Sequence, residues 1–199
     1  MSGLAPLLGV LAGAIGAVDT VPYVRDILAG RTRPYRWTWL IWAVLAIVVC
    51  ASQRADGASW SLLMAATQAV LTSVIFVLAI RRGEGVLGTG ERAMLAVAAT
   101  GVVGWLVAGE PVVATACVVV ADLIGTAMML PKTYRDPDSE TLATFALASV
   151  AGALAAGAVG RLDASLLLYP VYFCVANAAI ALLIVSRRGQ APAAFRPSP

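Results

Sequence analysis

Two stretches with a shared layout decide the fold: VPYVRDILAGRTRPYRWTWLIW at Val21–Trp42 and LPKTYRDPDSETLATFALASVA at Leu130–Ala151. Each begins where an apolar segment reaches a proline, and each runs through a polar loop into another apolar segment. We predict a helix that ends at the proline, a loop, and a second helix. The alignment that superposes the prolines, Pro22 with Pro131, also pairs Gly16 with Gly125 and Thr32 with Thr141. The chain is therefore expected to contain an internal repeat.

The composition around these stretches is that of a membrane protein. The chain has 199 residues, of which 60% are hydrophobic and only 13% are charged, and its mean hydropathy is +0.87. Soluble domains carry about 25% charged residues, so this chain has too few to cover a water-exposed surface. An ordinary soluble enzyme is excluded, and an integral membrane protein is expected.

Seven apolar segments approach the roughly 20 residues that a membrane-spanning helix needs. They are Leu4–Tyr23, Trp37–Ser52, Ala58–Ile80, Ala93–Ala108, Val112–Leu130, Thr141–Val159 and Ala164–Val185. The second and fourth are short, and we expect them to gain a turn from their flanks. The fold class predicted is all-α, with seven transmembrane helices.

The basic residues predict an orientation for these segments. One set of loops, together with the C-terminal tail, holds twelve of the 14 Lys and Arg residues: Arg25, Arg31, Arg33, Arg36, Arg81, Arg82, Arg92, Lys132, Arg135, Arg187, Arg188 and Arg196. The opposite set holds only Arg54 and Arg161. The positive-inside rule then predicts a cell-membrane protein with its N-terminus outside and its C-terminus in the cytoplasm. The composition, poor in Lys and rich in Ala, Gly, Val and Arg, favours a bacterial source.

The repeat divides the chain into four parts. Residues 1–85 form a first three-helix repeat, 86–110 a linker helix, 111–188 a second three-helix repeat and 189–199 a cytoplasmic tail. The third and seventh segments also end alike, in Arg81-Arg82-Gly83 and Arg187-Arg188-Gly189. A repeat of three helices would be inverted if it were duplicated directly, and one extra crossing restores parallel bundles.

Several kinds of chemistry lack the residues they need. The chain has no histidine, and Cys50, Cys117 and Cys174 lie singly in apolar runs. We therefore expect no metal site, no cofactor and no enzymatic activity. Because topology accounts for the net charge of +3, no nucleic-acid partner is expected either.

The two proline loops resemble those of the PQ-loop/SWEET superfamily of transporters. The nearer match is Leu130-Pro131-Lys132-Thr133-Tyr134-Arg135 followed by Ser139-Glu140-Thr141, and the looser one is Val21-Pro22-Tyr23 followed by Arg31-Thr32-Arg33-Pro34. Tyr23 and Lys132 stand where the family has glutamine. The resemblance implies two parallel three-helix bundles joined by a linker helix, with alternating access to a site between them and hinges at Pro22 and Pro131.

The resemblance also suggests amide-bearing site residues. Sugar transporters of this family carry an asparagine in both the third and the seventh helix, and Asn177 matches the second of these. Its repeat counterpart here is Leu71, so a symmetric sugar clamp is not expected, and Gln68 is a candidate for the missing amide.

Two aspartates lie within the predicted spans, where an ionisable group is costly and marks a functional site by default. Asp122 follows Val118-Val119-Val120 in the fifth segment. It is a candidate for proton coupling or for binding a cationic group of a substrate, and the alternative is a protonated acid bonded to a neighbouring helix. Asp19, three residues before Pro22, has the same two candidate roles, and its alternative is a pair with a loop arginine.

Aromatic and amide side chains complete the candidate binding site. Tyr169, Tyr172 and Asn177 can share a face of the seventh segment, with Pro170 loosening that helix, although interhelical hydrogen bonds would explain them equally. Trp39 and Trp42 lie one turn apart in the second segment and are further candidates.

The sequence favours a secondary transporter for a small polar solute such as a sugar or an amino acid, with proton coupling through Asp122 as one option. A ligand or cargo receptor of the same fold is the alternative. An intramembrane aspartyl enzyme would need Asp19 and Asp122 at one site. The expected partners are a small-molecule substrate and the lipid bilayer, and a homo-oligomer stays open.

Overall fold

The chain consists of helices joined by short loops in the computed structural model, which describes residues 4–55, 60–107, 111–159, 162 and 164–190. Its elements are α1 (Leu4–Val18), α2 (Thr20–Leu28), α3 (Arg36–Ala55), α4 (Trp60–Arg82), α5 (Thr89–Val107), α6 (Pro111–Arg135), the short 3-10 helix η1 (Pro137–Ser139), α7 (Leu142–Ala158) and α8 (Ala164–Gln190). No β-strand occurs among these residues. Each of the seven predicted segments contains a helix, and the second and fourth extend at their flanks as expected.

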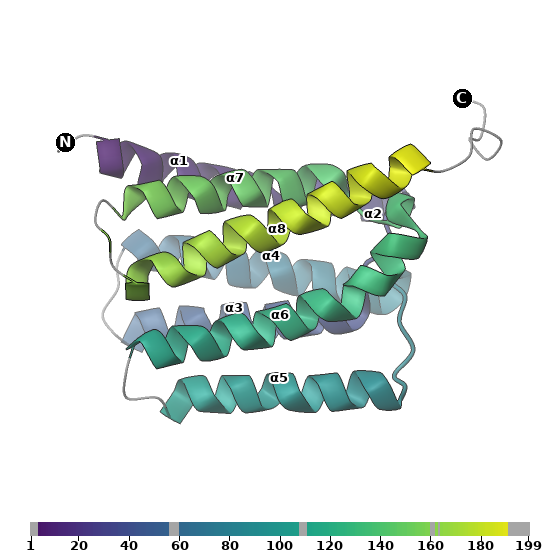
Figure 1. Ribbon diagram of the computed structural model, residues 1–199, viewed down its shortest axis with the longest axis horizontal. Coiled ribbons are helices and arrows are strands. Elements are labelled where there is room, and N and C mark those ends of the chain that lie inside the picture. Colours follow the sequence, from purple (N-terminus) through teal and green to yellow (C-terminus); the bar gives the residue numbers. More distant parts are fainter. Residues whose placement is uncertain (1–3, 56–59, 108–110, 160–161, 163, 191–199) are drawn as a thin grey trace.

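The prediction that helices end at Pro22 and Pro131 was wrong. The break in the first segment lies at Asp19, and Pro22 sits in the first turn of α2, where its missing N–H is tolerated. Helix α6 continues through Pro131 to Arg135 and bends as it approaches that end (Figure 1). A proline removes one backbone hydrogen bond, which bends a helix without obliging it to stop.

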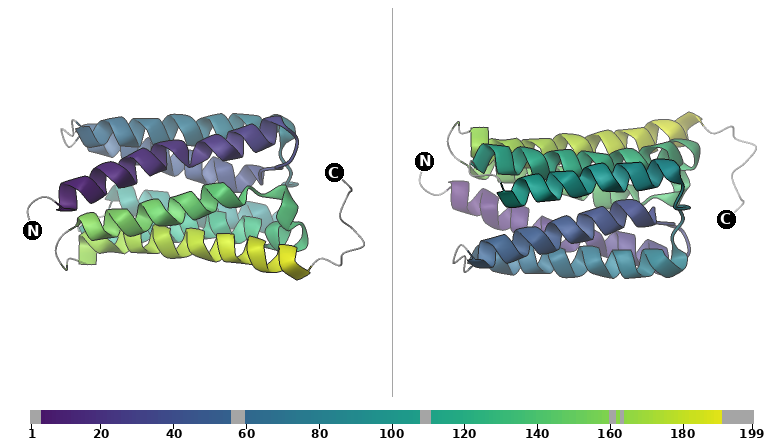
Figure 2. Two further views of the ribbon diagram at one scale, coloured as in Figure 1. Left: turned by 90° about the horizontal axis from the view of Figure 1, so that it is seen from above. Right: turned by 90° about the horizontal axis from the view of Figure 1, so that it is seen from below.

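The helices pack in a pattern that repeats along the chain (Figures 1 and 2). Helix α8 packs against both α6 and α7, and α4 packs against α3 and more lightly against α1. Two further contacts, α1 with α7 and α3 with α6, join these groups, while α5 packs mainly on α6. Under the alignment of Pro22 with Pro131, α1 corresponds to α6 and α3 to α7. The two joining contacts are therefore equivalent to each other.

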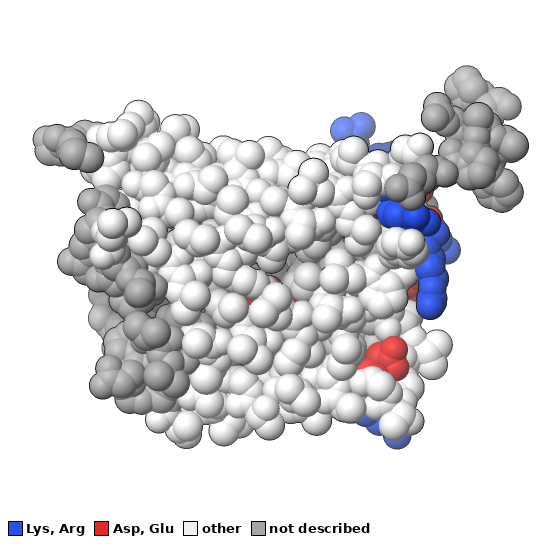
Figure 3. All heavy atoms as spheres, viewed as in Figure 1, with Lys and Arg blue, Asp and Glu red and all other residues white. Residues whose placement is uncertain are grey.

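Charged side chains gather at one end of the helices (Figure 3). Along the helices the described surface is apolar, and large side chains such as Val10, Leu106 and Leu182 are 64–70% exposed. Among the described residues, Leu4–Leu28, Ala116–Arg135 and Leu167–Gly189 are long and apolar enough to cross a membrane. An exposed apolar surface of this extent fits a lipid environment.

Candidate functional site

A carboxyl group lies in the middle of α6, away from the charged end. Asp122 is partly exposed, and its Oδ2 accepts a 2.5 Å hydrogen bond from the Tyr172 hydroxyl of α8. Asp122 forms no ion pair within the described part of the chain. Two predicted site residues are thus brought together, and the acid has a neutral donor rather than a cation.

Trp42 brings α3 to the same carboxyl group. The close approach depends on Gly125 in α6, because a Cβ there would lie 3.2 Å from Trp42 Nε1. The Thr38 hydroxyl donates a 2.5 Å hydrogen bond to the Gly125 carbonyl and fixes α3 against α6. The Trp42 indole interacts with Asp122, yet its buried N–H has no hydrogen bond of good geometry to any described residue.

Aromatic rings continue from this carboxyl group in two directions. On α8, Tyr169 lies 6.4 Å from Tyr172 and 5.9 Å from Phe173, measured between ring centroids. On α3, the rings of Trp39 and Trp42 meet edge to face at 5.0 Å. Trp39 is turned toward the charged end, where its indole N–H donates to the Tyr23 hydroxyl at 3.1 Å. Of the two predicted tryptophans, Trp42 therefore belongs to the Asp122 site.

A second buried carboxyl group, Glu140, lies at the charged end. It is 1% exposed, accepts a 2.6 Å hydrogen bond from the Tyr23 hydroxyl and forms a 2.5 Å ion pair with Lys132 Nζ. Burial raises the pKa of Glu140, while the Lys132 ammonium and the Tyr23 hydroxyl oppose that shift. Tyr23 and Lys132 are the two repeat-related residues that replace the family's glutamines, and both bind this one side chain.

The loops that precede α3 and α7 meet around Glu140. Thr32 and Thr141, which the repeat aligns, lie 2.6 Å apart between their hydroxyl oxygens, and the Arg33 amide donates to the Ser139 carbonyl at 2.9 Å. Arg33 also pairs with Asp136, and Lys132 donates to the Arg33 carbonyl. We call this set the loop junction: Tyr23, Thr32, Arg33, Lys132, Asp136, Ser139, Glu140 and Thr141. It joins the two repeats at the charged end.

One arginine from each repeat supports its own loop in an equivalent way. Arg82 of α4 donates to the carbonyl of Leu28 at 2.8 Å, and Arg188 of α8 donates to that of Pro137 at 3.2 Å. Leu28 and Pro137 are equivalent under the alignment of Pro22 with Pro131. The repeated Arg-Arg-Gly ends of α4 and α8 therefore make repeated contacts.

Asn177 and Asp19 hydrogen-bond to groups other than those of the Asp122 site. The Asn177 amide donates to the Phe173 carbonyl of its own helix at 2.8 Å. Asp19 is 4% exposed and accepts a 2.9 Å bond from its neighbour Thr20, and the alternative, a pair with a loop arginine, is not formed among the described residues. The side chain of Gln68 lies outside the described part of the chain.

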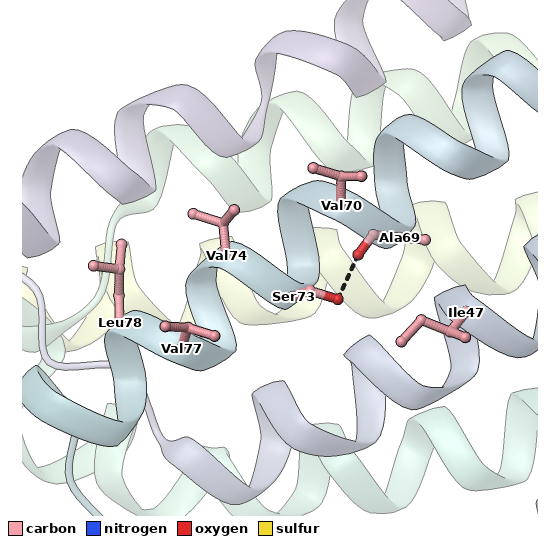
Figure 4. Close-up of a pocket in the computed structure, with 7 residues that line it drawn as sticks. All are labelled: Ile47, Ala69, Val70, Ser73, Val74, Val77 and Leu78. Atoms are coloured by element: carbon pink, nitrogen blue, oxygen red, sulfur yellow. Dashed lines mark hydrogen bonds between the residues drawn. The ribbon is translucent and has the colours of Figure 1, made fainter.

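A pocket of about 500 Å³ lies elsewhere, between α3 and α4, and does not coincide with this site (Figure 4). Its lining includes Ile47, Val70 and Val77, and the one hydroxyl there, that of Ser73, bonds the Ala69 carbonyl of its own helix at 2.6 Å. It is an apolar groove without a group that selects a polar ligand.

Within the described residues, no three His, Cys, Asp or Glu side chains come together in a way that could hold a metal ion. No family model, no curated protein and no solved structure matches the chain. The site must therefore be interpreted from its own chemistry.

Proposed function

We propose that the protein is a membrane transporter that moves a small polar solute by alternating access. In this proposal seven helices span the membrane, with the N-terminus outside and the charged end in the cytoplasm. One bundle comprises α1 to α4, the other comprises α6 to α8, and α5 links them. This is the arrangement that the PQ-loop/SWEET resemblance implies.

The repeated contacts support two parallel bundles. The α1–α7 and α3–α6 contacts are equivalent under the internal repeat, as are the arginine contacts to the Leu28 and Pro137 carbonyls. Two equivalent bundles that meet along two equivalent seams can rock against each other about a site between them.

The observation that carries the proposal is a closed polar junction at one end, with a carboxyl group deeper between the helices. The groups that bridge the bundles at that end are polar, notably Tyr23 with Glu140 and Thr32 with Thr141. Such polar contacts can be broken and formed again as the bundles move, whereas opening an apolar interface would expose its apolar surface. Pro22, beside the break at Asp19, and Pro131, in the bend of α6, are the hinges of this proposal.

The test is to lock the junction. In a variant without the three native cysteines, Thr32→Cys and Thr141→Cys are introduced together, and flux is measured in proteoliposomes. The substrate is first sought by thermal shift at pH 5.5 and 7.5 with sugars, amino acids, polyamines, vitamin precursors and nucleosides, since a ligand of the folded state stabilises it.

Oxidation is expected to stop flux in the double variant, and reduction to restore it. Each single-cysteine variant, treated with the same oxidant, is the matched control and should keep its flux. A locked protein that still transports would overturn the proposal. A solute that binds but never crosses the membrane would instead favour a receptor.

A further inference from the structure

Within the part of the chain that the structure describes, the Asp122 carboxyl group has no positive partner on any helix packed against it. Helix α8 presents Tyr172 and Tyr169, and α3 presents Trp42. The charged residues of α5, Glu91 and Arg92, lie in its first turn at the charged end. On α6 itself the nearest basic residue is Lys132, ten residues and therefore about 15 Å along the helix.

An ionised carboxyl group in this position is costly, by about 2.5–3.5 kcal/mol on insertion scales. Two occupants remove that charge: a proton on the carboxyl group, or a cation beside it. Both give a neutral site, while the empty carboxylate is the expensive state. The site therefore favours an exchange in which one occupant leaves as the other arrives.

The surroundings favour a cation over a hydroxyl-rich solute. A sugar needs many hydrogen-bonding side chains, but the Asn177 amide is bonded to its own helix. The described polar side chains around Asp122 are Tyr172, Tyr169, Thr126 and Trp42. Indole and phenol rings next to a carboxylate attract ammonium and guanidinium groups through their faces.

Resting on the proposed transport function, we propose that the Asp122 site binds a small organic monocation and that this cation and a proton occupy the carboxyl group alternately. When the cation enters, the proton leaves Asp122 for the solution from which the cation came. When the cation leaves, a proton returns. One proton is thus exchanged for one monocation, and no net charge crosses the membrane.

The experiment uses two pairs of probes that differ in charge and little in shape. Choline is compared with 3,3-dimethylbutan-1-ol, and guanidinium with urea at concentrations that do not denature. For the purified full-length protein we measure thermal stability and, in weak buffer, proton release. A cation is expected to stabilise the protein and to release about one proton per site, and its neutral isostere to do neither. On the acid side, the apparent affinity should weaken by about tenfold per pH unit, since proton and cation compete.

Three variants separate a binding role from a structural one. Asp122→Asn retains an oxygen that can accept the Tyr172 hydrogen bond, yet it should lose cation binding and proton release. Tyr172→Phe retains the carboxyl group and the ring but loses the hydroxyl that donates to Asp122, so it should still release a proton when a cation binds, at a weaker apparent affinity because the proton competes more strongly. Asp19→Asn, the matched control at a buried aspartate outside the Asp122 site, should retain both cation binding and proton release.

The other possible results test the cation–proton exchange and the transport proposal separately. If no cation stabilises the wild type, or if Asp122→Asn binds the probes as the wild type does, the inference is overturned. Flux of a neutral solute that survives Asp122→Asn would overturn the inference and leave the transport proposal standing. Cation binding with proton release but without flux would sustain the inference and overturn transport.

Discussion

Two carboxyl groups, the buried Glu140 and the partly exposed Asp122, each accept a short hydrogen bond from a tyrosine, at 2.6 and 2.5 Å. Only Glu140 also has a cation, Lys132, whose side chain is itself 8% exposed. The charge of Glu140 is therefore balanced inside the protein, while that of Asp122 is left for a proton or a ligand. The Glu140 contact therefore holds two repeats together, whereas the Asp122 carboxyl group can exchange its occupant.

The two hydrogen bonds also differ in whether they join the two repeats or lie within one. Tyr23 and Glu140 come from different repeats, so their bond ties α2 to the loop before α7. Tyr172 and Asp122 come from α8 and α6 of the same repeat. Motion between the repeats would break the first bond and leave the second intact.

The largest expected effect on stability is that of Lys132→Met, which leaves the buried Glu140 carboxyl group without its cation. Breaking a buried ion pair from one side costs about 3–5 kcal/mol, and thermal unfolding in detergent should register a loss of that order. Because burial raises the pKa of Glu140, protonation can neutralise the stranded group, so the deficit should shrink as pH falls. The double variant Lys132→Met/Glu140→Gln should recover most of the loss.

Arg31→Gln is the control for this prediction. Arg31 pairs with Asp26 at 2.5 Å, but its side chain is 58% exposed, and exposed pairs contribute about 0–1 kcal/mol. If Lys132→Met were no more destabilising than Arg31→Gln, Lys132 would not balance a buried charge on Glu140, and this difference between Glu140 and Asp122 would be wrong.

Tyr23→Phe should have the next largest effect. It removes a hydrogen bond to a charged group, which contributes about 1.5–3 kcal/mol, from the closed form of the loop junction. The open form should gain roughly tenfold to a hundredfold in population, since about 1.4 kcal/mol corresponds to a factor of ten. The labelling rate of a cysteine at Thr141, in a background without native cysteines, measures this.

Tyr172→Phe is the matched variant for that measurement. It deletes an equally short bond, but one within a single repeat, so the labelling rate at position 141 should stay near that of the parent. Equal acceleration by both variants would mean that the two carboxyl groups respond to one common loosening of the bundle.

The helices were predictable from the sequence because apolar length is a local property. All seven segments contain helices. The alignment of Thr32 with Thr141 predicted equivalent positions in a repeat, and their contact was visible only in the structure. The ends of helices were less predictable. Pro131 predicts a stop from its missing N–H, but the packing of α6 against its neighbours keeps the helix going to Arg135.

The site was predictable in its members but not in its contacts. Asp122 and Tyr172 stand out as polar residues in apolar runs, yet only the packing of α6 against α8 brings them together. Glu140 was missed as a functional residue because it lies in a loop that looks solvated. The signal available was its position in the repeated motif, eight residues from the only lysine.

Asp122→Asn should change stability little, within about 1 kcal/mol, because the amide oxygen still accepts the Tyr172 bond and no cation is stranded. Glu140→Gln, the same substitution at the balanced site, should be the more destabilising because it strands Lys132. Thermal unfolding of both variants at one pH makes the comparison. Equal losses would show that Asp122 has a partner of its own.

The smallest effect is expected at a third tyrosine–carboxylate contact, Tyr35 with Glu91 at 3.0 Å, which lies at the more open rim of the charged end. Burial, followed by the hydrogen bond to Glu91, raises the pKa of Tyr35 from 10.0 to about 12. Below pH 10 the hydroxyl is protonated in both the folded and the unfolded state, so its contribution to stability is complete. As pH rises from 10 to 12 that contribution is lost, because the unfolded chain ionises first. The difference in melting temperature between the wild type and Tyr35→Phe should therefore narrow over that range. Because water already solvates Glu91, the difference in melting temperature should be small at every pH. A large difference would mean that exposure does not distinguish the Tyr35–Glu91 contact from the Tyr23–Glu140 and Tyr172–Asp122 contacts.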